Sequence, residues 1–329
     1  MHTRRLGSAG PAVSALGLGC MGFSGGYGPV DDAESIATIQ AALDAGISYL
    51  DTGDFYGAGQ NEMLLREALK GRRDQAFIAV KFGALRGPDL QWYGNDARPA
   101  AVKNFLAYTL RRLGTDYVDL YQPARVDPAV PIEETVGAIA DMVQAGFVRH
   151  IGLSEASAAT VRRAHAAHPI AALQIEYSLM SRSVEQAIMP ALRALGISLV
   201  AYGVLSRGLI ADHTRAGVSK PGEIRGRMPR FQDENFSRNL VLVEALKAIA
   251  RDKGCTTAQL AIAWVASRNC SRRLAPISGM TSSPRDAIGA LEITLSPADT
   301  ARIESAMPAD AVAGDRYGAA LMTHLDSEH

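Results

Sequence analysis

Short apolar runs alternate along the chain with longer segments whose apolar residues recur every three or four positions. A short apolar run between polar residues is typical of a buried strand, and the longer spacing is typical of a helix with one buried face. The pattern predicts eight strands. They are Ala15–Leu18, Tyr49–Asp51, Phe77–Lys81, Val118–Tyr121, His150–Ser154, Leu173–Glu176, Leu199–Tyr202 and Leu274–Ile277.

Helical patterns lie between these strands. They cover Asp31–Ala45, Pro99–Leu113, Ile132–Ala145 and Val184–Leu195, and a glycine follows each one. Glycine accepts the left-handed backbone that ends a helix. Eight strand–helix units in 329 residues predict an α/β fold, a TIM (β/α)8 barrel that forms a single domain over residues 1–329. An open doubly wound sheet is the alternative, but no Gly-rich dinucleotide turn follows an early strand.

Some segments stand outside the repeat. Thr3–Leu6 and Ala12–Ser14 predict an N-terminal β-hairpin that closes one end of the barrel. Two helical patterns, Arg238–Lys253 and Thr257–Ser267, separate the last two strands, so one is an extra helix near the C-terminus. Residues 204–237 lack periodicity, and a connection this long is usually functional. In a barrel it would emerge beside the carboxyl ends of the strands, where such folds carry their sites.

Charge and composition exclude several classes of function. Lys plus Arg and Asp plus Glu both total 34, so no strong positive field attracts nucleic acid or anionic membranes. No apolar run has the length of a membrane span, and the first residues lack the core of a signal peptide. Cys20, Cys255 and Cys270 form neither a metal motif nor a disulfide framework. We expect a cytoplasmic protein without a metal; its oligomeric state is not indicated.

Three polar residues at strand ends are the candidate catalytic group. Asp51 ends the second predicted strand, Tyr56 follows in the next loop, and Lys81 ends the third strand. A buried lysine needs a partner, and Asp51 on the adjacent strand can provide it. The ammonium should lower the pKa of a nearby tyrosine, ordinarily about 10. Such a group can protonate a carbonyl oxygen; a structural ion pair beside an ordinary loop tyrosine is the alternative.

Further segments match a known family in the same order. They are Leu16–Met21, Leu50–Thr52, Asn61–Glu62, Asp119–Tyr121, Arg125–Asp127, Gly152–Ser154 and Gln174–Tyr177. With the three residues above, they resemble the aldo-keto reductase superfamily over nearly the whole chain. The resemblance implies a barrel enzyme that reduces an aldehyde or ketone to an alcohol with NADPH. It also implies that Tyr56 is the general acid and that Lys81 and Asp51 tune it.

One position departs from that family. A histidine usually precedes the Arg-Val-Asp segment, and here Ala124 stands in its place. The second hydrogen-bond donor to the carbonyl oxygen is then missing, and loss of such a donor typically lowers the rate by about 10²–10³. Weak activity on simple aldehydes is one consequence. A water, Gln122 or a group of the substrate could instead replace the donor, or the added room could admit a bulkier substrate.

The resemblance also implies a binding site for NADP(H) across the barrel mouth. Ser154, Glu155 and Gln174 would hold the carboxamide, although asparagine is usual where Glu155 stands, and Tyr202 would stack on the ring. Two further groups would contact the cofactor: Gly19, Cys20 and Met21, and the pyrophosphate loop Leu205, Ser206, Arg207 and Gly208. The 2′-phosphate would bind at a helix start, at Ser278, Gly279, Thr281, Ser282 and Arg285. A plain helix cap is the alternative there.

An aromatic set predicts the pocket for a small carbonyl substrate. It consists of Phe23, Phe55, Trp92 and Tyr93, with Ala124 beside it. Aromatic walls suit a flat or apolar ligand. Two alternative functions stay open at this point. One is a cofactor-binding regulatory subunit similar to the β-subunits of potassium channels, and the other is an enzyme that mainly oxidises a sugar or a pyridoxal-type alcohol.

Overall fold

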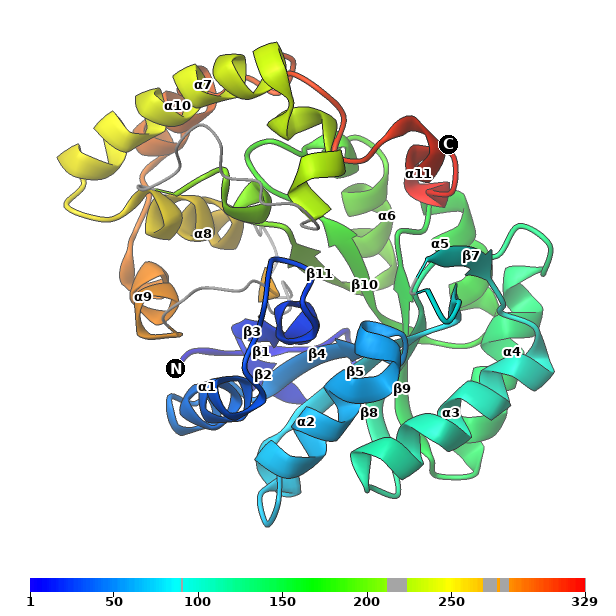
Figure 1. Cartoon of the computed structure of the whole chain (residues 1–329). Coiled ribbons are helices and arrows are strands. Elements are labelled where there is room, and N and C mark those ends of the chain that lie inside the picture. Colours follow the sequence, from blue (N-terminus) through cyan, green and yellow to red (C-terminus); the bar gives the residue numbers. More distant parts are fainter. Residues whose placement is uncertain (90, 212–223, 269–276, 279–283, 329) are drawn as a thin grey trace.

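Eight parallel strands close into a barrel at the centre of the molecule (Figure 1). This computed structural model describes residues 1–89, 91–211, 224–268, 277–278 and 284–328. The barrel strands are β3 (Leu16–Gly19), β4 (Tyr49–Gly53), β5 (Phe77–Phe82), β8 (Val118–Pro123), β9 (Val148–Ser154), β10 (Ile170–Glu176), β11 (Ser198–Tyr202) and β12 (Ile277–Ser278). The predicted TIM barrel is confirmed, although residues 274–276 of the last predicted strand lie outside the described part.

Helices cover the outside of the barrel, as Figure 1 shows. They are α1 (Asp32–Asp44), α2 (Gln60–Ala68), α3 (Pro99–Leu113), α4 (Ile132–Gln144), α5 (Ala158–Ala167), α6 (Ile188–Leu195), α7 (Asp233–Asp252), α8 (Thr257–Ser267), α9 (Pro284–Gly289), α10 (Pro297–Ala306) and α11 (Ala319–Met322). The extra helix before the last strand is therefore present. None of the helices that the structure describes is both long and apolar enough to cross a membrane.

Two antiparallel hairpins flank the barrel. The predicted hairpin of β1 (Thr3–Arg5) and β2 (Ala12–Ser14) is present. Its neighbour Leu6 and its own Val13 belong to one buried cluster with the lower barrel residues Tyr49, Phe77, Ala79, Leu120, Ala172 and Val200, so the hairpin closes the amino-terminal end. The second hairpin, β6 (Ala84–Arg86) with β7 (Trp92–Asn95), was not predicted.

The barrel interior is apolar at one end and polar at the other. Side chains alternate along a strand, so every second residue points inward. Above the apolar cluster, the next inward positions carry the buried polar side chains of Asp51, Lys81, Gln122, Ser154 and Gln174. These positions lie at the carboxyl ends of β4, β5, β8, β9 and β10. The fold therefore gathers polar groups from five strands at the end where TIM barrels carry their sites.

The last residues of the chain return to this polar end. Ala313 exchanges two hydrogen bonds of 2.9 Å with the side chain of Asn239 on α7. Leu325 is buried against Met228 and Tyr317, and the His324 ring meets the edge of Trp92 on β7 at 4.6 Å. In Figure 1 this red segment, with α11, lies near the teal strand β7. We call residues 307–328 the C-terminal segment.

Candidate active site

The predicted pair of Asp51 and Lys81 is formed in the barrel interior. The Lys81 Nζ donates to Asp51 Oδ1 at 2.6 Å, and the two side chains are only 7% and 6% exposed. They meet because β4 and β5 are neighbours in the barrel. Burial opposes the charge on Lys81, but the carboxylate of Asp51 outweighs it and raises the pKa of the lysine. Lys81 is therefore a permanent cation at neutral pH.

Tyr56 lies directly beside this cation. It begins the 3₁₀ turn η2 (Tyr56–Gly59), and the Lys81 Nζ is 5.1 Å from the centre of its ring. Burial raises the pKa of Tyr56, the charge and hydrogen bond of Lys81 offset only part of that rise, and the resulting pKa is about 12. The expected net decrease in this pKa is therefore wrong, because desolvation outweighs the ammonium. The consequence suits a proton donor, since the hydroxyl keeps its proton at neutral pH.

A second buried carboxyl supports the Tyr56 loop. The backbone N–H of Asp54 donates to the Lys81 carbonyl at 2.9 Å, which ties the loop to the end of β5. Burial raises the pKa of Asp54 to about 7, and the nearby charge of Glu62 raises it further, while Arg112 opposes both. Arg112 also forms an ion pair with Glu62, which is fully buried. Sequence reasoning gave Asp54 no role, although an acid two residues before a candidate catalyst was a usable signal.

Ala124 lies just past the end of β8. It is 2% exposed, and its N–H donates to the Phe82 carbonyl at 2.8 Å, so the backbone is held against β5. Arg125 folds back and donates to the Ala124 carbonyl at 2.6 Å. The amide of Gln122 donates to Gln174 Oε1 at 2.9 Å. Because that bond occupies a Gln122 donor, the idea that Gln122 replaces the missing histidine is weakened.

Glu155 directly follows β9, and the C-terminal segment contacts its carboxylate. Arg316 donates to both oxygens of Glu155, at 2.9 and 2.6 Å. The hydroxyls of Ser327 and Tyr202 donate to it as well, at 2.8 and 2.6 Å. Burial opposes ionisation, but the guanidinium of Arg316 outweighs it, and the pKa of Glu155 is lowered to about 2. Whether this residue also meets a carboxamide stays a prediction.

Tyr317 extends the same contact to Arg207, in the loop predicted to bind the pyrophosphate. Its hydroxyl lies 3.0 Å from that of Tyr202, and Arg207 donates to it at 2.7 Å. Arg207 also pairs with Glu176 at 3.1 Å. Sequence reasoning missed Arg316 and Tyr317 because they stand in a polar stretch without periodicity. Glu155 could have indicated such a partner. It is a carboxylate at a position where asparagine is usual, and a buried carboxylate requires a cation.

The remaining cofactor candidates lie around the barrel mouth. Gly19 ends β3, and Cys20 and Met21 open the turn η1 (Cys20–Ser24), where burial raises the pKa of the Cys20 thiol. Ser154 and Gln174 are each 2% exposed, and their strands pair in register.

The loop predicted to bind the pyrophosphate has an unusual backbone. Leu205 precedes η5 (Ser206–Gly208), whose three residues have φ values of 47°, 57° and 88°. Two of these are not glycine, so this loop holds a strained left-handed conformation. The pocket predicted for a 2′-phosphate lies mostly outside the described residues. Ser278 pairs with Tyr202 and Gly17 on the neighbouring strands, and Arg285 lies in α9, but their side chains are not described, nor are Gly279, Thr281 and Ser282.

Comparison with known proteins places this barrel in a family. A sequence model described as the aldo/keto reductase family matches residues 15–308. This chain belongs to the aldo/keto reductase family. It is 43% identical over 319 residues to probable aldo-keto reductase 1 of Glycine max, covering 95% of this chain and 91% of that relative. Membership supports an oxidoreductase that uses a nicotinamide cofactor and acts on small carbonyl compounds.

Solved structures of the family share the fold. The aldo-keto reductase of Bacillus halodurans in its holo form is 29% identical, with a TM-score of 0.78, covering 94% of this chain and 97% of its own. The glycerol dehydrogenase of Gluconobacter oxydans is 24% identical, with a TM-score of 0.81, covering 99% and 96% of the two chains. At that lower identity the likeness concerns the fold alone.

The aromatic residues predicted to line the substrate pocket of this aldo-keto reductase are not all in one place. Phe55 stands edge-on to Tyr56 with ring centres 4.8 Å apart, and Phe23 is buried in η1. Trp92 meets His324 of the C-terminal segment. Tyr93 is 64% exposed, and its hydroxyl donates to Asp89 at 3.2 Å. Phe55 therefore has the best-supported place beside the proton donor, and the others stay predictions.

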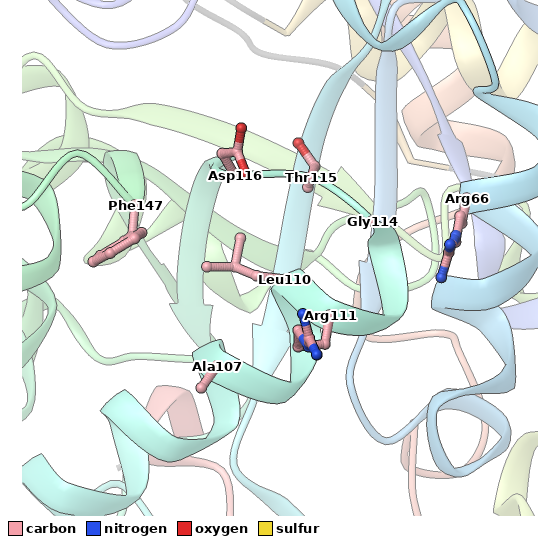
Figure 2. A pocket seen from close by; sticks show the side chains of 8 residues that line it. All are labelled: Arg66, Ala107, Leu110, Arg111, Gly114, Thr115, Asp116 and Phe147. Atoms are coloured by element: carbon pink, nitrogen blue, oxygen red, sulfur yellow. The ribbon is translucent and has the colours of Figure 1, made fainter.

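A surface hollow lies apart from the candidate catalytic residues. A hollow of about 710 Å³, shown in Figure 2, is lined by Arg66, Ala107, Leu110, Arg111, Gly114, Thr115, Asp116 and Phe147. Asp116 and Phe147 lie within two residues of the starts of β8 and β9, so this hollow lies at the end of the barrel opposite the polar layer. Within the described ranges, no group of three or more His, Cys, Asp or Glu residues could hold a metal ion.

Proposed function

We propose that this aldo-keto reductase uses NADPH to reduce an aldehyde or ketone to an alcohol, with Tyr56 as the proton donor. The observation that carries the proposal is the buried ion pair of Lys81 and Asp51, 2.6 Å apart, beside the Tyr56 ring. The desolvation of a buried ion pair can cost more than the attraction between its charges returns, so stability alone is a weak reason for a lysine here. Stabilising negative charge on a neighbouring phenol is a role that a neutral residue could not fill.

The proton moves from Tyr56 to the carbonyl oxygen as that oxygen gains charge. Burial holds the pKa of Tyr56 at about 12, so the hydroxyl is protonated when the substrate arrives. As the proton leaves, the ammonium of Lys81 stabilises the phenolate, and Asp51 keeps that ammonium charged. The hydroxyl of the new alcohol can return the proton when the reaction runs backwards.

The residues at the barrel mouth fit a nicotinamide group. The cofactor, when bound, supplies the hydride. Gln174 and Ser154 offer buried polar groups at the carboxyl ends of β10 and β9, and Tyr202 offers a flat ring at the end of β11. We assign Arg207 to the pyrophosphate, because its guanidinium lies 5.8 Å from the centre of the Tyr202 ring and is a group that binds phosphate.

The cofactor preference is tested by fluorescence titration of the protein with NADPH and NADH. We expect tighter binding of NADPH, because Arg285 is the second residue of α9, at the place assigned to the 2′-phosphate. Arg285→Ala should remove most of the difference, while Arg302→Ala, at an exposed pair with Asp252, should leave it unchanged. Equal affinities in the parent protein would contradict the preference for NADPH.

The reaction itself is tested by a carbonyl-substrate screen with both cofactors. We expect turnover of at least one aldehyde or ketone, with the cofactor oxidised in equal amount. Because Ala124 leaves space beside the reacting carbonyl, bulky substrates should be preferred over small ones. A protein that binds NADPH tightly but turns over nothing in either direction would favour a regulatory cofactor-binding role instead.

A further inference from the structure

Two glutamine side chains bridge the barrel interior. Gln122 on β8 donates its Nε2 hydrogen to Gln174 Oε1 on β10, at 2.9 Å. The two are 0% and 2% exposed. Their strands are not neighbours, because β9 runs between them. The Gln122 side chain therefore crosses a whole strand to reach its partner.

Gly152 on β9 makes this crossing possible. A Cβ atom at that position would stand 2.7 Å from Gln122 Oε1, closer than real Cβ contacts come. The φ of Gly152 is ordinary, so glycine is needed here for space and not for backbone conformation. Any other residue would push the Gln122 amide off its path.

The direction of this hydrogen bond determines which polar group of the Gln174 amide, the oxygen or the NH₂, stays available to a ligand. A side-chain amide has one acceptor end and one donor end. Gln122 uses the acceptor end of Gln174, so its NH₂ end is left for other groups. Gln122 Oε1 itself is buried and has no hydrogen-bond partner among the residues that the structure describes. Leaving a buried acceptor unpaired is unfavourable, so packing alone does not account for a glutamine here.

We propose that Gln122 is a positioning residue for the cofactor: it turns the Gln174 amide so that its NH₂ end faces the carboxamide oxygen of the nicotinamide. The proposal rests on the proposed function, since it takes Gln174 as a ligand of the cofactor. Gln122 acts through Gln174 and through the narrow passage over Gly152. A fixed carboxamide in turn fixes which face of the ring points at the substrate.

A double-mutant cycle tests the coupling. The dissociation constant of NADPH is measured by fluorescence titration for the parent protein, Gln122→Met, Gln174→Met and the double variant. Methionine matches glutamine in length but makes no comparable hydrogen bond. We expect each single change to weaken binding roughly tenfold, and the double variant to bind like Gln174→Met alone. Binding by Gln122→Met equal to that of the parent, or fully additive losses, would overturn the proposal.

Three further readouts separate positioning from simple packing. Gln122→Asn keeps an amide in the barrel but falls one carbon short of Gln174, so it should lose the same affinity as Gln122→Met. Gly152→Ala should lose that affinity too, because its methyl group displaces Gln122. With cofactor deuterated at one face of C4, the parent should transfer hydrogen from one face and Gln122→Met from both. Single-face transfer in Gln122→Met contradicts the proposal; failure of the parent to bind NADPH contradicts the proposed function instead.

Discussion

Two of the buried ion pairs at the mouth of this barrel differ in the parts of the molecule that they join. Lys81 and Asp51 meet at 2.6 Å from adjacent strands, 30 residues apart in the chain. Arg316 and Glu155 also meet at 2.6 Å, but 161 residues apart, and they join the C-terminal segment to the barrel. All four side chains are at most 7% exposed.

Each pair controls the charge beside a different tyrosine. Next to Tyr56 stands the cation of its pair, so negative charge on that phenol is stabilised. Next to Tyr202 stands the anion of the other pair, because the Tyr202 hydroxyl donates to Glu155. Burial raises the pKa of Tyr202, and the charge of Glu155 raises it further. The same kind of ion pair therefore prepares one phenol for proton transfer and fixes the other as a hydrogen-bond donor.

Breaking the first pair should have the largest effect. We expect Lys81→Met to lower kcat by about 10²–10⁴, because the phenolate loses its cation. It should also destabilise the protein by about 3–5 kcal/mol, because Asp51 stays buried without a partner. Adding Asp51→Asn should restore most of the free energy of unfolding, measured with urea, but not the rate. Recovery of both would reduce the pair to a structural role.

The next largest effect is the change of the rate of alcohol oxidation with pH. Reduction needs the protonated Tyr56, and its pKa of about 12 predicts a reduction rate that is flat from pH 6 to about 10. Alcohol oxidation needs the phenolate and should rise about tenfold per pH unit over that range. Profiles of kcat/KM against pH measure both. A reduction rate that already declines between pH 7 and 8 would contradict a raised pKa.

Breaking the second pair should affect stability more than chemistry. Arg316→Met removes the cation from Glu155, but the C-terminal segment can detach and let water reach the carboxylate. We therefore expect a loss of about 1–3 kcal/mol, faster proteolysis within residues 307–328, and a kcat within about tenfold of the parent. The exposed pair of Arg302 and Asp252 is the matched control, with Arg302→Met costing at most about 1 kcal/mol. If Arg316→Met lowered kcat as much as Lys81→Met does, the two ion pairs would not differ in their roles.

The smallest predicted effect concerns Ala124. Its position is 2% exposed, so the larger side chain of Ala124→His must displace its neighbours or enter the proposed substrate site. We expect KM for the preferred bulky substrate to rise about fivefold or more, in line with about 1 kcal/mol of overpacking. If instead kcat on small aldehydes rises about 10²-fold, the alanine is a simple loss of a donor. A neutral result for every substrate would place Ala124 away from the reacting group.

The sequence predicts the barrel well because its strands are short apolar runs in a regular order. It does not predict α2, since buried Asn61 and Glu62 interrupt the apolar face of that helix. Asn61 is inside because its amide donates to the Cys20 carbonyl at 2.8 Å. The spacing of apolar residues does not reveal a polar residue that is buried because tertiary hydrogen bonds satisfy it.

Some features of the candidate site are also predictable from the sequence, and others are not. Asp51 and Lys81 are predictable, because consecutive strands of a parallel barrel are neighbours and their ends meet. The pKa of Tyr56 is not, because it depends on how deeply the fold buries the ring. Arg316 is not predictable either, since loop closure over 161 residues leaves no local pattern. Only the unusual carboxylate of Glu155 indicates that a cation must come from elsewhere.

The central claim is that Tyr56 donates the proton, and one variant tests it most directly. Tyr56→Phe removes a single oxygen and leaves the pair of Lys81 and Asp51 in place. The measurement is kcat on the best carbonyl substrate, together with the dissociation constant of NADPH. We predict that kcat falls by about 10²–10⁴ while cofactor affinity stays within about twofold. A variant that turns over substrate as fast as the parent would contradict the account.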